Sequence, residues 1–249
     1  MSAPRDYLHA DWPAPPWVHA VTTTRSGGVS AAPYASFNLG DHVGDDPAAV
    51  RVNRAALRAD LGLPAEPLWL TQVHGTRIVD ARRAAPGAEA DGAVTPAPGI
   101  VCAVLTADCL PVFVCDRAGT RAALVHAGWR GLAAGAVERA VEALGLPGER
   151  LLAWLGPAIG PAAFEVGAEV RDAFVAHDRA AAADFHDGRD GRFRADLYGL
   201  ARRRLAARGV TAVSGGRRCT HGEADRFFSF RRDGRCGRMA SLIWLDPAP

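Results

Sequence analysis

The stretch from Thr106 to Gly131 constrains the fold of this chain most, because it predicts a β-hairpin with reactive side chains at its open end. Two short apolar runs, Pro111–Cys115 and Arg121–Val125, are rich in residues typical of strands. The residues between them, Asp116–Thr120, have the composition of a turn. If the turn centres near Ala118, position 110 faces position 126 across the hairpin.

Cys109 and His126 are therefore expected to lie within one residue of each other at the open end of this hairpin. A thiol and an imidazole held this close serve either as metal ligands or as a nucleophile and its base. The hairpin alone leaves both uses open.

The composition of the chain is that of an ordinary globular protein, with 249 residues, 49% hydrophobic and 22% charged. All 29 basic residues are arginine, since the sequence contains no lysine. This excludes Schiff-base chemistry on a lysine and phosphate binding by a P-loop lysine. The formal net charge is only +2 and no arginine cluster is interleaved with aromatic residues, so no nucleic-acid partner is expected.

Several features predict a cytoplasmic protein. Residues 1–17 are interrupted by prolines and contain no apolar segment, so we expect an irregular N-terminal extension there. No apolar run is long enough to span a membrane, and no membrane partner is expected. The five cysteines contain no C-x-x-C pair, which suits a reducing compartment better than a disulfide framework.

Helices and strands are expected to alternate irregularly, without a repeat or a linker that would divide the chain. The clearest helix runs from Pro47 to about Leu61, with Asp46 as its N-cap and Gly62 beyond its end. Further helices are predicted over Leu132–Leu144 and Asp196–Arg208. Strands are predicted over Val18–Thr23, Leu151–Leu155, Phe227–Phe230 and Met239–Leu245. We expect one catalytic domain, residues 1–249, of the α/β class, with mixed sheets and flanking helices.

A third candidate ligand is His74, in the segment Gln72–Gly75. A catalytic zinc site uses three protein ligands and leaves the fourth position to water or substrate. His74, Cys109 and His126 would supply such a set, but no regular spacing links them. Motifs of other enzyme classes are absent: the sequence has no G-x-S-x-G, no H-E-x-x-H, no G-x-G-x-x-G after a strand, and no P-C-x-x-C.

Short motifs over nearly the whole chain, from about Thr22 to Leu245, resemble a single protein family. They are Thr23–Arg25, Gly27–Ser30, Asn38–Gly40, Val43–Pro47, Gln72–Gly75, Ala90–Gly92, Thr106–Cys109, His126–Gly131, Ile159–Pro161, Phe227–Gly234 and Gly237–Ala240. The family was once labelled polyphenol oxidoreductase or laccase domain. It is now described as zinc purine nucleoside phosphorylases and adenosine deaminases, and it includes the peptidoglycan editing factor. Phe230 stands where the family more usually has tyrosine.

The resemblance implies an α/β fold similar to that of a cysteine-histidine deamidase toxin. It also implies a zinc ion held by His74, Cys109 and His126. The implied reactions are phosphorolysis of adenosine, inosine and methylthioadenosine, and hydrolytic deamination of adenosine. Nucleosides and phosphate are accordingly the expected small-molecule partners.

Three further residues are candidates for the site. Arg25 and Arg130 could bind phosphate, because a guanidinium is permanently charged and can donate two parallel hydrogen bonds. Either arginine could equally form a structural ion pair. Asp108, next to the candidate ligand Cys109, could move protons or hold an imidazole in position, as carboxylates near metal ligands commonly do.

Other functions stay open at this point. The older family label suggests copper-dependent oxidation of phenols, although a multicopper cluster needs more histidines than one mononuclear site supplies. A metal-free hydrolase with Cys109 as nucleophile and His126 as base would act by covalent catalysis, and the peptidoglycan editing factors suggest muropeptide precursors as its substrates. A purely structural zinc is disfavoured by a site with only three protein ligands.

Overall fold

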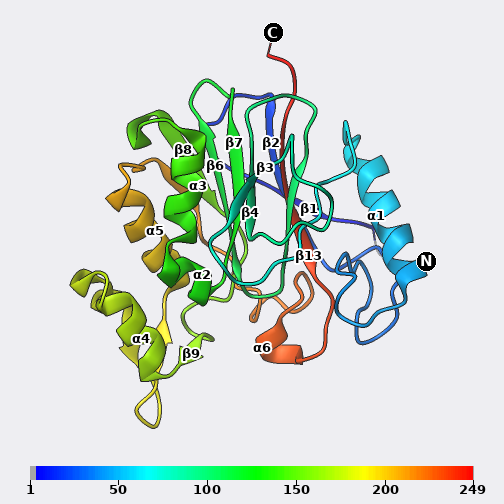
Figure 1. Cartoon of the computed structure of the whole chain (residues 1–249). Coiled ribbons are helices and arrows are strands. Elements are labelled where there is room, and N and C mark those ends of the chain that lie inside the picture. The colour runs from blue at the N-terminus through cyan, green and yellow to red at the C-terminus, as the bar shows by residue number, and fades with distance from the viewer. Residues whose placement is uncertain (1–3, 249) are drawn as a thin grey trace.

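The computed structural model describes residues 4–248, which form a layered sandwich of two β-sheets between helices (Figure 1). Residues 1–3 of the expected N-terminal extension lie outside the described part. Helices α2 (Trp129–Ala134), α3 (Ala136–Leu144) and α5 (Leu197–Ala207) form one outer layer, and α1 (Pro47–Leu61) forms the other. The single α/β domain with mixed sheets and flanking helices is therefore confirmed.

The larger sheet has six strands in the order β12-β8-β6-β7-β4-β3. Its outer strand pairs, β12 with β8 and β3 with β4, are parallel, and its central pairs are antiparallel. The strands are β3 (Ile78–Asp80), β4 (Gly92–Thr95), β6 (Leu110–Asp116), β7 (Ala122–Ala127), β8 (Leu151–Leu155) and β12 (Val213–Gly215). The predicted hairpin is β6 and β7, with Pro111 opposite His126, one position from the expected register.

Alternation along β6 explains how this sheet separates two apolar layers. Val112 and Val114 pack on the helical side, in the same cluster as Leu132 and Leu144 of the helices. Phe113 and Cys115 point the other way, into the apolar layer between the two sheets. Because successive side chains of a strand lie on opposite faces, a fully apolar strand of this kind can be buried on both sides.

The second sheet has four strands in the order β1-β2-β13-β5. They are β1 (Tyr7–His9), β2 (Val18–Thr23), β5 (Cys102–Thr106) and β13 (Met239–Leu245). The prediction of an irregular extension was wrong for Tyr7–His9, which pair with Thr23–Val21 of β2. The prolines on both sides of this segment indicated irregular structure, but pairing with β2 stabilises a strand there.

Helix α1 covers the outer face of the second sheet. Its buried Leu57 packs with Val21 and Leu242 of β2 and β13. The predicted ends are confirmed: Asp46 accepts a hydrogen bond from the Ala48 amide, and Gly62 has a left-handed conformation.

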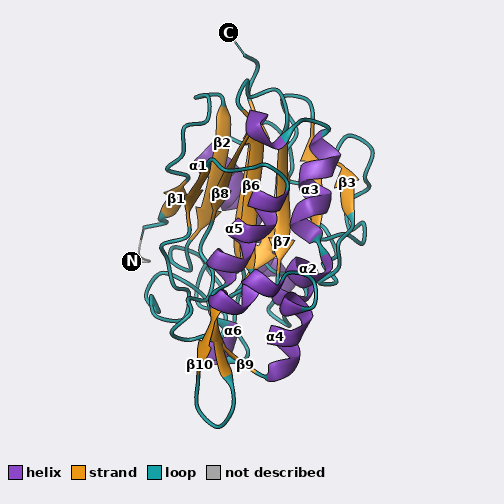
Figure 2. Ribbon diagram, turned by 90° about the vertical axis from the view of Figure 1, so that its left-hand side faces the viewer, coloured by secondary structure: helices purple, strands orange, loops and turns teal. Residues whose placement is uncertain are grey.

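A smaller three-stranded sheet lies beyond one end of the sandwich (Figure 2). It consists of β9 (Glu165–Val166), β11 (Phe193–Ala195) and β10 (Phe185–Asp187), with α4 (Ala168–Val175) beside it. A short 3₁₀ helix, Arg179–Asp184, packs against α4 beside this sheet, and a second one, Gly148–Arg150, precedes β8 at the opposite end of the sandwich.

Two predicted elements differ from the structure. The helix expected over Leu132–Leu144 is two helices, because Gly135 has a φ of 97° and breaks the path between α2 and α3. The strand expected over Phe227–Phe230 is wrong. Phe227 and Phe228 lie in an irregular segment, and Phe230 begins the short helix α6 (Phe230–Asp233), which Ser229 caps.

None of the helices within residues 4–248 is both long enough and apolar enough to cross a membrane.

The irregular segment between β2 and α1, residues 24–46, is tied to α1 by Asn53. The Asn53 side chain is buried; its Nδ2 donates to the carbonyl of Asn38, and its Oδ1 accepts from the amide of Val29. Asn38 in turn holds the amides of Gly40 and Arg238 through its Oδ1. This network places the segment that carries His42 against the start of β13.

We expect the variant Asn53→Ala to lose about 2 kcal/mol of unfolding free energy, because it leaves buried backbone groups without partners. Val52→Ala on the same helix is the control, since Val52 is exposed; its unfolding free energy should change by no more than about 0.5 kcal/mol. Urea unfolding measures both. Equal stabilities of the two variants would contradict the role given to Asn53.

Candidate metal centre

A pocket of about 380 Å³ opens at one edge of the sandwich, where β5 and β7 end and β6 and β13 begin. Because both sheets end there, the pocket collects residues that are far apart in the sequence. It is lined by His42, Gln72, His74, Leu105, Thr106, Ala107, Asp108, Cys109, His126, Ile159, Phe164, Phe230, Arg231 and Arg238.

The three residues predicted as metal ligands come together on one wall of this pocket. One ligand atom each of His74, Cys109 and His126 lies within 4.8 Å of the others. The Sγ of Cys109 is 3.9 Å from Nε2 of His74, and the two imidazole rings are nearly perpendicular, at 81°. The predicted adjacency of Cys109 and His126 is confirmed.

A buried carboxylate, Asp91, organises the cluster. It precedes β4 and is fully buried. Its Oδ1 lies 2.8 Å from Nδ1 of His126, so the other ring nitrogen of this histidine is left for the cluster. Burial opposes ionisation of Asp91, but the hydrogen bonds from His126 and from the Gly75 amide outweigh it and lower the pKa of the carboxyl.

The same carboxylate also fixes His74. The amides of Val73, His74 and Gly75 donate to it over 3.2, 2.9 and 2.6 Å. His74 has a φ of 60°, a conformation that costs energy for a residue with a side chain. Three hydrogen bonds to one charged acceptor offset this strain, and they direct the chain so that the imidazole of His74 meets Cys109.

Gly128, directly after β7, leaves room for the ligands. A Cβ atom at this position would lie 3.0 Å from both Sγ of Cys109 and Cδ2 of His74. Both contacts are tighter than ordinary packing. A side chain at position 128 would therefore push two of the three ligands apart.

The thiol and the imidazole influence each other's ionisation. Burial raises the pKa of Cys109, but the charge and the hydrogen bond of His126 outweigh it, so the net pKa is lowered. Burial lowers the pKa of His126, but the thiolate of Cys109 and the hydrogen bond to Asp91 outweigh it, so the net pKa is raised. The pair thus favours a thiolate, which is the form that binds metals.

These three donors fit a tetrahedral metal ion. Ligands of zinc at about 2.3 Å for sulfur and about 2.0 Å for nitrogen lie roughly 3.5 Å apart. Sγ of Cys109 lies 3.9 Å from Nε2 of His74, and all three donor atoms lie within 4.8 Å of one another. The cluster could therefore hold a metal ion at the wall of the pocket after the side chains draw closer together.

Asp108 lines the pocket but does not contact an imidazole in the role predicted for it. Its Oδ1 accepts from the hydroxyl of Thr220, and its Oδ2 accepts from the hydroxyl of Ser229 and from the amide of Arg231. Its φ is 93°, which turns the chain sharply just before Cys109. Asp108 thus anchors the segment 220–231 next to the candidate ligand Cys109, while Asp91 holds the imidazole of His126.

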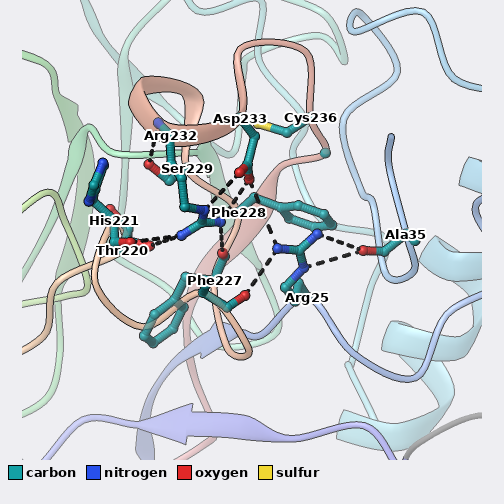
Figure 3. Close-up of polar contacts among 12 residues, drawn as sticks. Arg25, Ala35, Thr220, His221, Phe227, Phe228, Ser229, Arg232, Asp233 and Cys236 are labelled. Atoms are coloured by element: carbon teal, nitrogen blue, oxygen red, sulfur yellow. Dashed lines mark hydrogen bonds and ion pairs between the residues drawn. The ribbon is translucent and has the colours of Figure 1, made fainter. Parts of the chain in front are cut away.

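Arg25 and Arg130, the candidate phosphate residues, are absent from the pocket lining formed by residues 4–248. Figure 3 shows Arg25 donating to the carbonyl of Ala35 and paired with Asp233, which also binds Arg232. The guanidinium of Arg25 lies 4.8 Å from the ring centre of Phe228. Arg130 is exposed and lies over the ring of Trp129. Phosphate binding by these two arginines stays a prediction, to which the position of the pocket adds no support.

Sequence reasoning missed three groups of the site. Asp91 lies in the motif Ala90–Gly92, but nothing in the neighbouring sequence assigns its carboxylate to the site. Arg231 and Arg238 lie in the motifs Phe227–Gly234 and Gly237–Ala240, but nothing local shows that both face the pocket. His42 reaches the pocket through the irregular segment 24–46, for which no periodic pattern exists.

The fold and the cluster define the class of this protein: a single-domain α/β protein with a histidine-cysteine-histidine set at the wall of a pocket. Residues 19–246 match the model of a family described as multi-copper polyphenol oxidoreductase laccase. The chain belongs to this family, as the motifs indicated.

Similar proteins carry a more specific name. The chain is 57% identical over 241 residues to a Pseudomonas aeruginosa protein called purine nucleoside phosphorylase, covering 96% of this chain and 98% of that protein. It is 53% identical over 235 residues to the purine nucleoside phosphorylase YfiH of Escherichia coli, covering 94% and 96%. The crystal structure of a Neisseria meningitidis protein superposes with a TM-score of 0.93 at 52% identity, covering 97% and 99%.

Asp91→Asn is expected to weaken zinc binding roughly 10- to 100-fold, because an amide presents an N–H group where the carboxylate accepts hydrogen bonds. Competition of the protein with a chromophoric chelator measures the affinity. Asp80→Asn is the control, since Asp80 lies at the end of β3 and binds Arg82 at the surface. A zinc affinity of Asp91→Asn within twofold of the parent protein would refute the role of Asp91.

Proposed function

We propose that this chain is a zinc-dependent purine nucleoside phosphorylase that also deaminates adenosine. The expected phosphorolysis substrates are adenosine, inosine and methylthioadenosine, each giving the free base and a sugar 1-phosphate. The observation that carries the proposal is the cluster of His74, Cys109 and His126 on the wall of a pocket of about 380 Å³. The phosphorylase names of relatives 53–57% identical to the chain support the same activity.

The lining of the pocket suits a nucleoside. Leu105, Ile159, Phe164 and Phe230 supply apolar surface, and the aromatic ring of Phe230 is exposed. Flat apolar walls of this kind bind a purine base, while scattered polar groups orient the sugar. Phe230 stands where the family more usually has tyrosine, so its contribution to base binding would come from its ring alone.

The chain's own residues would position the reactants. Zinc in the cluster would supply a Lewis acid at the pocket wall. Asp91 would keep the imidazole of His126 turned toward the cluster. In phosphorolysis an oxygen of phosphate forms a bond to C1′ of the sugar while the bond from C1′ to the base breaks, and the base leaves with its electron pair. In deamination, water replaces the amino group of the base.

Experiments can distinguish two other activities from this proposal. A copper-dependent phenol oxidase would consume oxygen when a phenol is added. A metal-free hydrolase that uses Cys109 as its nucleophile would lose activity with an alkylating reagent and keep it with a chelator. The phosphorylase would lose activity with both treatments.

Adenosine incubated with and without inorganic phosphate tests the proposal most simply. Adenine and ribose 1-phosphate should form only with phosphate, and inosine should form under both conditions; liquid chromatography identifies the products. The variant Cys109→Ala should lose at least on the order of 10²-fold in rate, since removing a ligand costs more than removing its supporting partner. Cys102→Ala, a buried cysteine of β5 outside the pocket, is the control. Absence of all three products from the parent protein would refute the proposal.

A second test concerns Thr106, whose hydroxyl oxygen is buried at the pocket without a hydrogen-bond partner among the described residues. A buried hydroxyl without a partner is costly, and a substrate group would satisfy it. Thr106→Val should therefore raise the KM for adenosine about 10-fold without lowering the melting temperature.

Thr22→Val is the matched control for this variant. Thr22 is also buried, but its hydroxyl is 2.8 Å from that of Ser241. This variant should lower the melting temperature and leave the KM for adenosine unchanged. An unchanged KM in Thr106→Val would mean that the hydroxyl does not contact the nucleoside.

A further inference from the structure

Two arginines line the pocket without neutralising partners. Neither Arg231 nor Arg238 has a carboxylate oxygen within 4.0 Å in the described part of the chain. The neighbouring Arg232, by contrast, pairs with Asp233 at 2.7 Å. Two permanent positive charges that face a pocket without counter-charges attract an anion.

Both guanidinium groups are held in place by backbone carbonyls. Nη1 of Arg231 donates to the carbonyl of Glu165 over 2.8 Å. Nη1 of Arg238 donates to the carbonyls of Cys236 and Gly237 over 2.9 and 3.0 Å. These bonds occupy one nitrogen of each group, so the remaining nitrogens of each planar fork stay available for an acceptor with several oxygens.

The surroundings of these arginines keep their arrangement fixed. The guanidinium of Arg231 lies 5.4 Å from the ring centre of Phe164, and that of Arg238 lies 5.9 Å from that of Phe230. The amide of Arg238 donates to Asn38, and that of Arg231 donates to Asp108. These hydrogen bonds to the buried side chains of Asn38 and Asp108 fix the backbone position of both arginines.

His42 lines the pocket together with these two arginines. Burial lowers the pKa of His42, and the positive charge of Arg238, which lines the same pocket, lowers it further. A neutral imidazole still offers one N–H donor. The carboxylate of Asp108, also in the lining, is occupied by Thr220, Ser229 and the amide of Arg231.

We infer that Arg231 and Arg238, with His42 beside them, form the subsite for the phosphoryl group in this pocket. The inference rests on the proposed function and assigns inorganic phosphate, the second reactant, to this side of the pocket, with the metal cluster in the same pocket. The subsite binds a tetrahedral oxyanion through charge and through the free N–H groups of the two forks. It is a different location from the Arg25 and Arg130 positions predicted from the sequence.

A phosphoryl group could reach this subsite from two sources: inorganic phosphate, or the 5′-phosphate of a nucleotide. The first assignment predicts that Arg238→Gln and Arg231→Gln each raise the KM for phosphate roughly 10- to 100-fold and change the KM for adenosine less than twofold. Arg238→Lys, which keeps the charge and loses the fork, should show a smaller rise. Arg83→Gln, in an exposed turn outside the pocket, is the charge-matched control and should leave both constants unchanged.

Direct binding of inorganic phosphate to the zinc-loaded protein, measured by calorimetry, separates this inference from the proposed function. If the parent protein binds phosphate, the two glutamine variants lose binding and no nucleoside is cleaved, the subsite stands and the phosphorylase proposal fails. If the parent protein cleaves nucleosides and the variants keep its KM for phosphate, the subsite is refuted and the phosphorylase proposal stands.

Two further results would also overturn the inference. One is absence of phosphate binding to the zinc-loaded parent protein. The other is a nucleotide preference: adenosine 5′-phosphate is used better than adenosine, and Arg238→Gln removes this advantage without changing the KM for phosphate. Melting temperatures of the variants close to that of the parent protein show that the measured effects are not due to unfolding.

Discussion

The site depends on one buried carboxylate, that of Asp91. A charged group enclosed in protein is tolerated only when hydrogen bonds replace its water, and Asp91 receives three backbone amides and one imidazole nitrogen. By satisfying this one anion, the chain fixes the strained backbone at His74 and the ring orientation of His126 together. The arrangement of His74 and His126 around Cys109 thus follows from the hydrogen bonds that Asp91 accepts.

The sandwich explains why ligands from such distant parts of the sequence meet. Both sheets end at the same edge, so the end of β5, the start of β6 and the end of β7 supply Thr106, Cys109 and His126 within one pocket. Burial of both faces of the six-stranded sheet keeps these strand ends rigid. The opposite side of the pocket comes from irregular segments, which are held by Asn38 and Asp108.

Sequence patterns predicted the parts of the site that are formed by residues close together in the chain. The hairpin placed Cys109 beside His126, because turn composition and strand pattern fix which residues face each other. It could not reveal Asp91 or Arg238, whose positions follow from packing between distant segments. Phe230 shows a related limit: an aromatic run favoured a strand, but Ser229 caps a helix by accepting from the amide of Arg232. Adding His74 to the cluster required the family motifs, since its spacing carries no pattern.

The central claim is that this cluster is a zinc centre, and the metal content of the protein tests it most directly. The measurement is elemental mass spectrometry of protein purified without added metal. The account predicts about one zinc per chain, as expected from three nitrogen and sulfur donors with an open fourth position. Protein that carries no metal, or that carries stoichiometric copper instead, would contradict it.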